Sequence, residues 1–438
     1  MKHAMNDMLA RIIGTLARLT VARYRPAVVG VTGSVGKTST KLAVAAVLGS
    51  AYRVRAASGN LNNELGLSLA VLGDWSPEEL RLVSRDQPKG TARGRKLLFW
   101  VKVIFASLAR LAVKDKRYPD VLVLEYGADR PGDIRRLLRI VRPKVSVITA
   151  VGSVPVHLEY YSGPEEVARE KGRLIDVLPA NGFAVLNFDD ETVMRLATKA
   201  RARVLTYGFE KGAEVQAARF TNRAVRGRPA GIGFKIEHAG SSVPVTIPEV
   251  FGRAQAYAAS AAASVGLIFG MNLVRISEAL GKYRSADSRM QLLSGVKHAY
   301  LIDDSYNASP LSMAEALDTV MDLPAKRRIA VLGDMLEIGK YAPEAHEAVG
   351  RLAAKSVDAI FTVGPRAKFI ASAARGAGLG SAAIFSFDTA DEAAKPLQDF
   401  MKEGDLVLIK GSHSMELDKV VREVREVRDM TPSSSSLV

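Results

Sequence analysis

Residues 27–40, AVVGVTGSVGKTST, decide the fold of this chain. An apolar, β-branched run ends at a Gly-Ser-Val-Gly turn, and Lys37 with three hydroxyl residues then opens a helical stretch. This order of strand, glycine loop and helix is typical of sites that hold a polyphosphate, because amide groups at the helix start point at phosphate oxygens. The match is to the short G-x-x-G-K-T form, since Val31 stands where the longer pattern has glycine. We therefore predict a nucleotide site, with a chance glycine turn as the alternative.

A hydroxyl and a carboxylate beside this loop are suited to binding Mg²⁺. Lys37 would supply a mobile positive charge to the phosphates, and the hydroxyl of the next residue, Thr38, would bind the ion. The strand VLVLE at 121–125 ends in Glu125, and doubly wound sheets place their ligands at the C-terminal ends of such strands. The predicted nucleotide contacts in the loop are Gly33, Ser34, Val35, Gly36, Lys37, Thr38 and Ser39.

Composition narrows the class of protein. The 438 residues are 48% apolar and 24% charged, as in an ordinary soluble protein large enough for two or three domains. There is no cysteine, which excludes disulfides, thiolate metal sites and a cysteine nucleophile, and fits a cytoplasmic protein. The net charge of +15 favours anionic partners. No zinc-finger or RNP-like motif occurs, so we expect no nucleic-acid partner.

Two apolar stretches lie outside the expected sheet. Residues 1–25 show the pattern of a basic amphipathic helix without the features of a signal peptide. Residues 97–113 are more apolar, but Lys102 and Arg110 interrupt them and they are short for a membrane span. We expect a buried or interfacial helix there, and weak contact with an anionic membrane surface is the alternative.

The remaining pattern predicts an α/β fold in two parts. The first is a central doubly wound sheet of the P-loop NTPase type with an antiparallel flank at 203–248, and the second is a Rossmann-like α/β domain. The expected segments are a helix at 1–25, a central domain at 26–285 with an insertion at 75–119, a C-terminal domain at 286–430 and a disordered tail at 431–438. The expected strands are 52–56, 121–125, 145–150 and 183–187, then 299–303, 328–332, 358–362, 383–386 and 405–409.

Eight ordered stretches resemble the Mur ligase family. They are TGSVGKTST (32–40), GNLNNELG (59–66), LEYGADRPGDI (124–134), HLEYYSGPEEVAREKGRLI (157–175), AVLNFDD (184–190), IDDSYNASPLSM (302–313), VLGDMLEIG (331–339) and IKGSHSM (409–415). DSYNASP and GDMLE together resemble the MurF branch. This resemblance implies an ATP-dependent, cytoplasmic and monomeric ligase that adds D-alanyl-D-alanine to UDP-N-acetylmuramoyl-tripeptide through an acyl phosphate.

The resemblance also implies roles for residues of the first domain. Thr38 and Glu125 would hold one Mg²⁺ and His157 a second, while Lys171 would react with CO₂ to form a carbamate that assists the second ion. By itself, His157 reads as a structural histidine, and Lys171 as a solvated helix lysine among charged neighbours. Asn62, Asn63 and Glu64 would lie near the substrate, although a helix N-cap explains any one of them equally well.

Further roles fall mainly on the second domain. Arg289 would approach the ATP phosphates and Asp304 the ribose hydroxyls, so that catalysis requires domain closure. The residues implied near the base are Gln255, Tyr306 and Asn307. Those implied near the dipeptide and the closing interface are Asp334, Glu337, Lys410 and Ser412.

Three departures from the family pattern concern the acceptor rather than ATP. Only a basic helix precedes the phosphate loop, where MurF enzymes begin with a domain that grips the UDP-sugar. The G-x-H-N element appears as residues 252–255, ending in Gln255, and His413 replaces an arginine. The alternatives left open are an amide ligase with another acidic acceptor, such as a folate-like polyglutamate, and a non-catalytic nucleotide-binding scaffold at a membrane.

Overall fold

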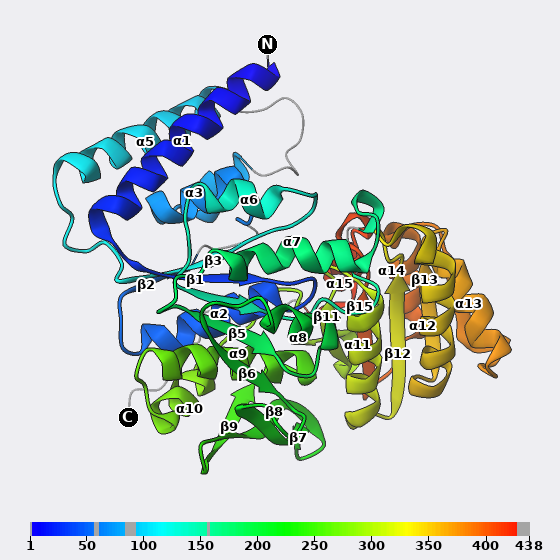
Figure 1. Cartoon of the computed structure of the whole chain (residues 1–438). Coiled ribbons are helices and arrows are strands. Elements are labelled where there is room, and N and C mark those ends of the chain that lie inside the picture. Colours follow the sequence, from blue (N-terminus) through cyan, green and yellow to red (C-terminus); the bar gives the residue numbers. More distant parts are fainter. Residues whose placement is uncertain (1, 57–60, 84–92, 156–157, 427–438) are drawn as a thin grey trace, which may run out of the picture. The chain divides into compact units, whose positions relative to one another are not determined.

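The computed structural model describes residues 2–56, 61–83, 93–155 and 158–426 (Figure 1). The chain divides into two compact units. The first comprises Met1–Arg223, Ala230–Ala286 and Glu337–Gly339, and the second comprises Ala224–Pro229, Asp287–Leu336 and Lys340–Val438.

In the described residues, the first unit is built on a nine-stranded sheet with the order β2-β3-β1-β4-β5-β6-β7-β8-β9. Strands β1 to β6 run parallel, and β8 and β9 form an antiparallel pair at the far end. The strands are β1 (Ala27–Thr32), β2 (Val54–Ala56), β3 (Val121–Glu125), β4 (Val145–Ile148), β5 (Phe183–Asn187), β6 (Arg203–Gly208), β7 (Val215–Val225), β8 (Arg228–His238) and β9 (Ser241–Pro248). The sheet therefore places β1, which leads into the phosphate loop, between β3 and β4.

Helices cover both faces of this sheet, and β1 shows why. Its side chains alternate, so Val29 and Val31 enter one core and Val28 the other. The first core is closed by α2 (Lys37–Gly49), α9 (Arg253–Ile268) and α10 (Leu273–Gly281). The second is closed by α1 (Lys2–Tyr24), α3 (Glu64–Leu72), α4 (Pro77–Arg81), α5 (Arg93–Ala112), α6 (Asp133–Leu138), α7 (Pro164–Asp176) and α8 (Glu191–Ala197).

Helix α1 forms a third layer over the second core. Its buried Ile13, Leu16 and Ala17 face inward, and it packs against both α3 and α5 (Figure 1). Helix α5 buries Phe99, Trp100 and its neighbours on one side and exposes a row of large apolar residues on the other. Among the described helices, none has the length and apolar character needed to cross a membrane.

The second unit contains its own sheet, with six strands among the described residues and the order β10-β11-β15-β12-β13-β14. Only the β10–β11 pairing is antiparallel. The strands are β10 (Gln291–Ser294), β11 (Tyr300–Asp304), β12 (Arg327–Gly333), β13 (Ala359–Val363), β14 (Ile384–Phe387) and β15 (Asp405–Lys410). The helices are α11 (Pro310–Asp322), α12 (Ala342–Ser356), α13 (Ala367–Gly376), α14 (Ala390–Phe400) and α15 (Asp418–Val424). Across both units, the short 3₁₀ turns among the described residues are η1 (Leu158–Tyr160), η2 (Val296–His298), η3 (Gly339–Tyr341), η4 (Ser381–Ala383) and η5 (His413–Met415).

The predicted fold class is confirmed. The differences lie at element ends and at β10, a strand that was not predicted. The strand expected at 52–56 begins only at Val54, because the amide groups of Ala51 and Tyr52 still donate to the Leu48 carbonyl at the end of α2. The helical patterns at 132–140 and 164–178 predict α6 and α7, and these helices end two residues earlier, at Leu138 and Asp176. The predicted tail at 431–438 lies outside the described residues.

Candidate active site

The phosphate loop is shaped by two glycines with positive φ. Gly33 has φ 149°, and a Cβ there would meet the Thr149 Oγ1 at 1.9 Å. Gly36 has φ 84° and caps α2 in the left-handed conformation, which favours glycine. The loop is fastened to the end of β4, because the Ser34 amide donates to the Ala150 carbonyl at 2.7 Å. The sequence therefore holds the backbone close to where a phosphate would bind.

Two loop side chains fit an anionic ligand. The Lys37 Nζ donates to the carbonyl oxygens of Gly33 and Ser34 at 2.9 and 3.3 Å, so its charge lies over the loop. The Ser34 Oγ is buried, and no described residue gives it a hydrogen-bond partner. Such an orphaned hydroxyl is rare in proteins and suits a site that takes a phosphate oxygen.

A hydroxyl and a carboxylate meet beside this loop. The Thr38 Oγ1 donates to the Glu125 Oε2 at 3.1 Å, and the Lys41 Nζ lies 3.5 Å from the same oxygen. Glu125 is only 2% exposed. Oxygen donors of these two kinds are the ligands that Mg²⁺ prefers, with phosphate oxygens and water completing the shell. The predicted pair is thus brought together.

Lys171 is buried on α7, and no hydrogen bond or ion pair ends at its amine among the described residues. Burial, and after it the positive charge of Lys37, lower the pKa of Lys171 to about 7, although Asp129 and Glu170 oppose this shift. A substantial fraction of the amine is therefore neutral near pH 7, which is the nucleophilic form. The interpretation of this residue as a solvated lysine is wrong.

The predicted second metal ligand, His157, lies outside the described residues. Within the described ranges, no group of three or more His, Asp or Glu side chains gathers in a way that could hold a metal ion. The Thr38–Glu125 pair therefore represents the described part of the predicted metal site.

The turn before α3 connects to the end of β3. The Gly127 amide donates to the Asn62 carbonyl at 2.9 Å, and the Asn63 side chain accepts from the Gly66 amide as the helix N-cap. Glu64 forms an ion pair with Arg136 at 2.9 Å. Asn63 thus has the capping role that the alternative interpretation gave it, which leaves its predicted substrate contact untested.

Gln255 is buried at the start of α9 and its amide is already engaged. Its Nε2 donates to the Ser285 Oγ at 3.2 Å, and its Oε1 accepts from the Tyr283 hydroxyl at 2.9 Å. These bonds fix the side chain in one orientation. An adenine contact at this residue stays a prediction.

In the second unit, the predicted residues gather at the C-terminal ends of three adjacent strands, β11, β15 and β12. Lys410 donates to the Asp304 Oδ2 at 2.6 Å and to the Asn307 carbonyl at 2.9 Å. The other Asp304 oxygen accepts from the Met290 amide at 3.1 Å. Asp304 and Lys410 therefore form a buried, hydrogen-bonded ion pair.

Aromatic contacts order the neighbouring side chains. The Arg289 guanidinium lies 4.1 Å from the centre of the Tyr306 ring, and the His413 ring lies 5.3 Å from the same ring. His413 therefore packs against the Tyr306 ring, with the two ring planes tilted by 30°.

The loop after β12 is fixed from two sides. An Asp334 oxygen accepts from the Ala367 amide at 2.7 Å, and the Ser412 Oγ accepts from the Leu336 amide at 2.9 Å. Glu337 follows with φ 63°. These contacts place the predicted residues on an ordered loop, without testing which of them meets a dipeptide.

Two residues of these sites were missed. Lys41 lies one helical turn after Lys37, and that i, i+4 spacing could have indicated its place beside Glu125. His346 accepts from the Met335 amide at 2.9 Å through Nε2, so its Nδ1 carries the proton toward the Ala342 carbonyl at 2.6 Å. Burial lowers the pKa of His346 and favours this neutral form. Its helical spacing from Ala342 and Val349 was the available signal.

Two family descriptions match the chain. "Mur ligase middle domain" matches residues 106–266, and "Mur ligase, glutamate ligase domain" matches residues 288–413.

Relatives extend the similarity over nearly the whole chain. A UDP-N-acetylmuramoyl-tripeptide–D-alanyl-D-alanine ligase of Mycobacterium leprae is 30% identical, over 95% of this chain and 78% of its own. The ligase of the same name from Bacillus subtilis is 27% identical, over 94% of this chain and 78% of its own. The crystal structure of MurF ligase from Thermotoga maritima in complex with ADP has a TM-score of 0.75 at 25% identity, over 94% of this chain and 83% of that one.

Proposed function

The chain belongs to the Mur ligase family, and we propose that it is the ATP-dependent ligase that joins D-alanyl-D-alanine to UDP-N-acetylmuramoyl-tripeptide in peptidoglycan precursor synthesis. The observation that carries the proposal is the Thr38–Glu125 contact beside the phosphate loop, in a chain whose relatives bear this ligase name along 94–95% of its length. A cytoplasmic, monomeric enzyme is part of the proposal.

The reaction needs charge and positioning more than covalent help from the protein. A carboxylate oxygen of the acceptor attacks the γ-phosphorus of ATP, which breaks the bond to ADP and gives an acyl phosphate. The dipeptide amine then attacks the acyl carbon, loses a proton and expels phosphate. Lys37 and the loop amides would stabilise the charge on the transferring phosphoryl group. Mg²⁺ held by Thr38 and Glu125 would neutralise phosphate charge.

Lys171 fits a carbamate better than it fits a fixed cation. Its buried amine, with a pKa lowered to about 7, is available as the neutral nucleophile. Attack of the neutral amine on CO₂ forms the N–C bond and releases one proton, which turns a neutral group into an anion. That anion would assist a second Mg²⁺ together with His157. The absence of a carboxylate partner among the described residues supports this role, because a lysine kept for its charge is usually paired when buried.

The remaining predicted residues complete the proposal in each unit. Asn62, Asn63 and Glu64 would guide the acceptor. Gln255, Arg289, Asp304, Tyr306 and Asn307 would contact ATP, and Asp334, Glu337, Lys410 and Ser412 would serve the dipeptide.

The test is phosphate release by the purified full chain with Mg²⁺-ATP, UDP-N-acetylmuramoyl-tripeptide and D-alanyl-D-alanine, with each component omitted in turn. We expect release only when all three are present. Phosphate release that requires ATP and dipeptide, but does not depend on this nucleotide, would assign another acceptor. The resemblance gives a reason to examine this outcome, because His413 stands where an arginine is expected. No release in any combination would contradict the ligase assignment.

A further inference from the structure

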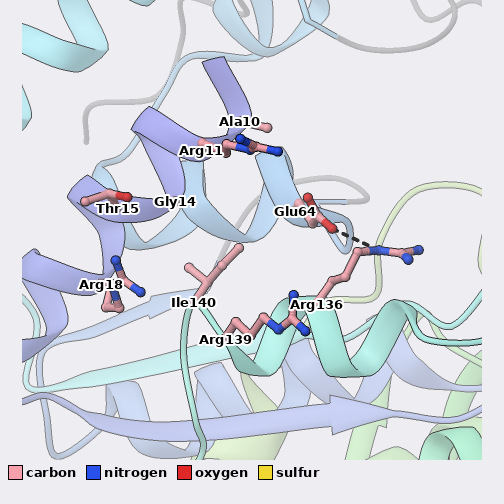
Figure 2. A pocket seen from close by; sticks show the side chains of 9 residues that line it. All are labelled: Ala10, Arg11, Gly14, Thr15, Arg18, Glu64, Arg136, Arg139 and Ile140. Carbon is pink, nitrogen blue, oxygen red and sulfur yellow. Dashed lines mark ion pairs between the residues drawn. The ribbon is translucent and has the colours of Figure 1, made fainter. Parts of the chain in front are cut away.

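A basic pocket lies on the first unit, away from the phosphate loop. It is formed by one face of α1, by α6 and the residues just after it, and by the first residue of α3 (Figure 2). Its volume is about 410 Å³. The lining residues are Ala10, Arg11, Gly14, Thr15, Arg18, Glu64, Arg136, Arg139 and Ile140. Four arginines and one carboxylate therefore surround a single hollow.

The charges in this pocket are not balanced. Arg136 is neutralised by Glu64 at 2.9 Å and by Asp133. For Arg11, Arg18 and Arg139, no ion-pair partner occurs among the described residues. Figure 2 shows their side chains around the opening, with the Glu64–Arg136 pair on one side. Three cations that share a pocket repel one another, and an anion bound between them would remove that repulsion.

Guanidinium groups also determine which anion fits. Arginine binds phosphate through two parallel N–H donors, and several arginines can hold adjacent phosphate groups. Ala10, Gly14 and Thr15 are small, so α1 offers room between the arginines rather than a filled surface. The pocket therefore suits a compact, multiply charged group such as a diphosphate.

We propose that this pocket binds the diphosphate of the nucleotide-linked acceptor, an inference that rests on the function proposed above. The pocket is continuous with the turn predicted to meet that acceptor, because Glu64 lines the pocket and begins α3 directly after Asn62 and Asn63. The Asn62 carbonyl accepts from the Gly127 amide, two residues beyond Glu125. One short connection thus joins the pocket to the predicted Mg²⁺ ligand.

The separation of the two sites fits the shape of the acceptor. Its reacting carboxylate and its diphosphate lie at opposite ends of a sugar and a tripeptide, and three extended residues alone span about 10 Å. The diphosphate must therefore bind outside the phosphate loop. A pocket built from other helices of the same unit meets that requirement.

A lipid headgroup offers the same phosphate chemistry. Large apolar residues are exposed nearby on α1 and α5, among them Ile12, Leu19 and Phe105. The link between this pocket and Asn62 through Glu64 favours the nucleotide. The experiment includes vesicles to separate the two sources.

The experiment compares two double variants with equal charge loss. Arg18→Ala/Arg139→Ala removes two pocket cations, whereas Arg135→Ala/Arg142→Ala removes two exposed arginines outside the pocket. We expect the KM for UDP-N-acetylmuramoyl-tripeptide to rise at least about tenfold in the pocket variant only. The kcat and the KM values for ATP and dipeptide should stay near those of the wild type. Arg18→Lys/Arg139→Lys should lie in between, because it keeps charge without the paired donors.

Direct binding keeps this inference separate from the ligase assignment. Titration calorimetry with UDP, in the presence of saturating ADP to occupy the phosphate loop, needs no turnover. Weaker UDP binding in the pocket variant but not in the control would support the pocket even if the omission assay gave no ligation. Equal UDP affinity in all variants would overturn it. Selective loss of binding to phosphatidylglycerol vesicles, with UDP binding unchanged, would assign the pocket to lipid and likewise overturn it.

Discussion

Two buried lysines, one in each unit, have opposite surroundings. Lys171 lies on α7 at 1% exposure with no described hydrogen-bond or ion-pair partner, and its pKa is lowered to about 7. Lys410, at 2% exposure, ends β15 and is held by Asp304 at 2.6 Å and by the Asn307 carbonyl. The Lys171 amine thus loses its proton easily, whereas Lys410 remains a cation paired with Asp304. The difference teaches that burial alone does not define the role of a lysine.

The largest expected effect is on catalysis at Lys171. Lys171→Met should lower kcat in the phosphate-release assay by about 10²–10³-fold, because the variant cannot form the carbamate. ATP binding, followed with a fluorescent analogue, should change little. Short carboxylic acids should restore part of the activity, whereas bicarbonate should not.

The matched control is Arg169→Met on the exposed face of the same helix, which should leave turnover unchanged. Wild-type turnover in Lys171→Met would remove the carbamate from the proposal.

A loss of stability is expected at Lys410. Lys410→Met leaves the Asp304 carboxylate buried without its partner, so denaturant unfolding should show a loss of about 3 kcal/mol. Asp304→Asn/Lys410→Met should recover more than half of that loss, since no isolated charge remains. A double variant no more stable than the single variant would show that the ion pair is not what Lys410 contributes.

A gain in stability is expected at Lys171, opposite in sign to the loss at Lys410. With a pKa of about 7 in the folded chain and 10.5 in the unfolded chain, this lysine binds more protons when unfolded between these two values. The free energy of unfolding of the wild type therefore rises with pH across this window. Lys171→Met should be more stable than the wild type by up to about 4 kcal/mol near pH 7, because the lowering of the pKa from 10.5 to about 7 corresponds to roughly that free energy, and the gain should fade toward pH 10.

This measurement is made by denaturant titration in CO₂-free buffer with a chelator, so that the amine is unmodified. If both lysine-to-methionine variants shifted stability in the same direction, the contrast between the two surroundings would be wrong.

Much of the fold could be predicted because its signals are local. Three local signals predict the centre of the first sheet: the β-branched run before Gly33, the loop that ends at Lys37 and the strand that ends at Glu125. The alternation of short strands and helices after residue 285 does the same for the second. The packing of α1 on α3 could not be predicted, because an amphipathic pattern shows which face is buried without naming its partner.

In the candidate site, too, local spacing predicts burial but not the partner of a side chain. Lys171 shares a helical face with Val167, Leu174 and Ile175, all buried, so its burial could be read from the spacing. The charges of its immediate sequence neighbours instead indicate a solvated position. The contact between the rings of His413 and Tyr306 joins residues more than a hundred positions apart, and no local pattern indicates such a contact.

The strand order also has a consequence for synthesis on the ribosome. Strand β1 is made early, yet its first neighbour β3 pairs Val121 with Ala27. At roughly 5–20 residues per second, the ribosome needs about 5–20 s to supply that neighbour. During this interval, Val28, Val29 and Val31, all buried in the finished sheet, have no strand to pair with. Until translation passes residue 125, the nascent chain therefore exposes an unpaired apolar strand. We expect chaperones that bind emerging polypeptides to recognise this strand.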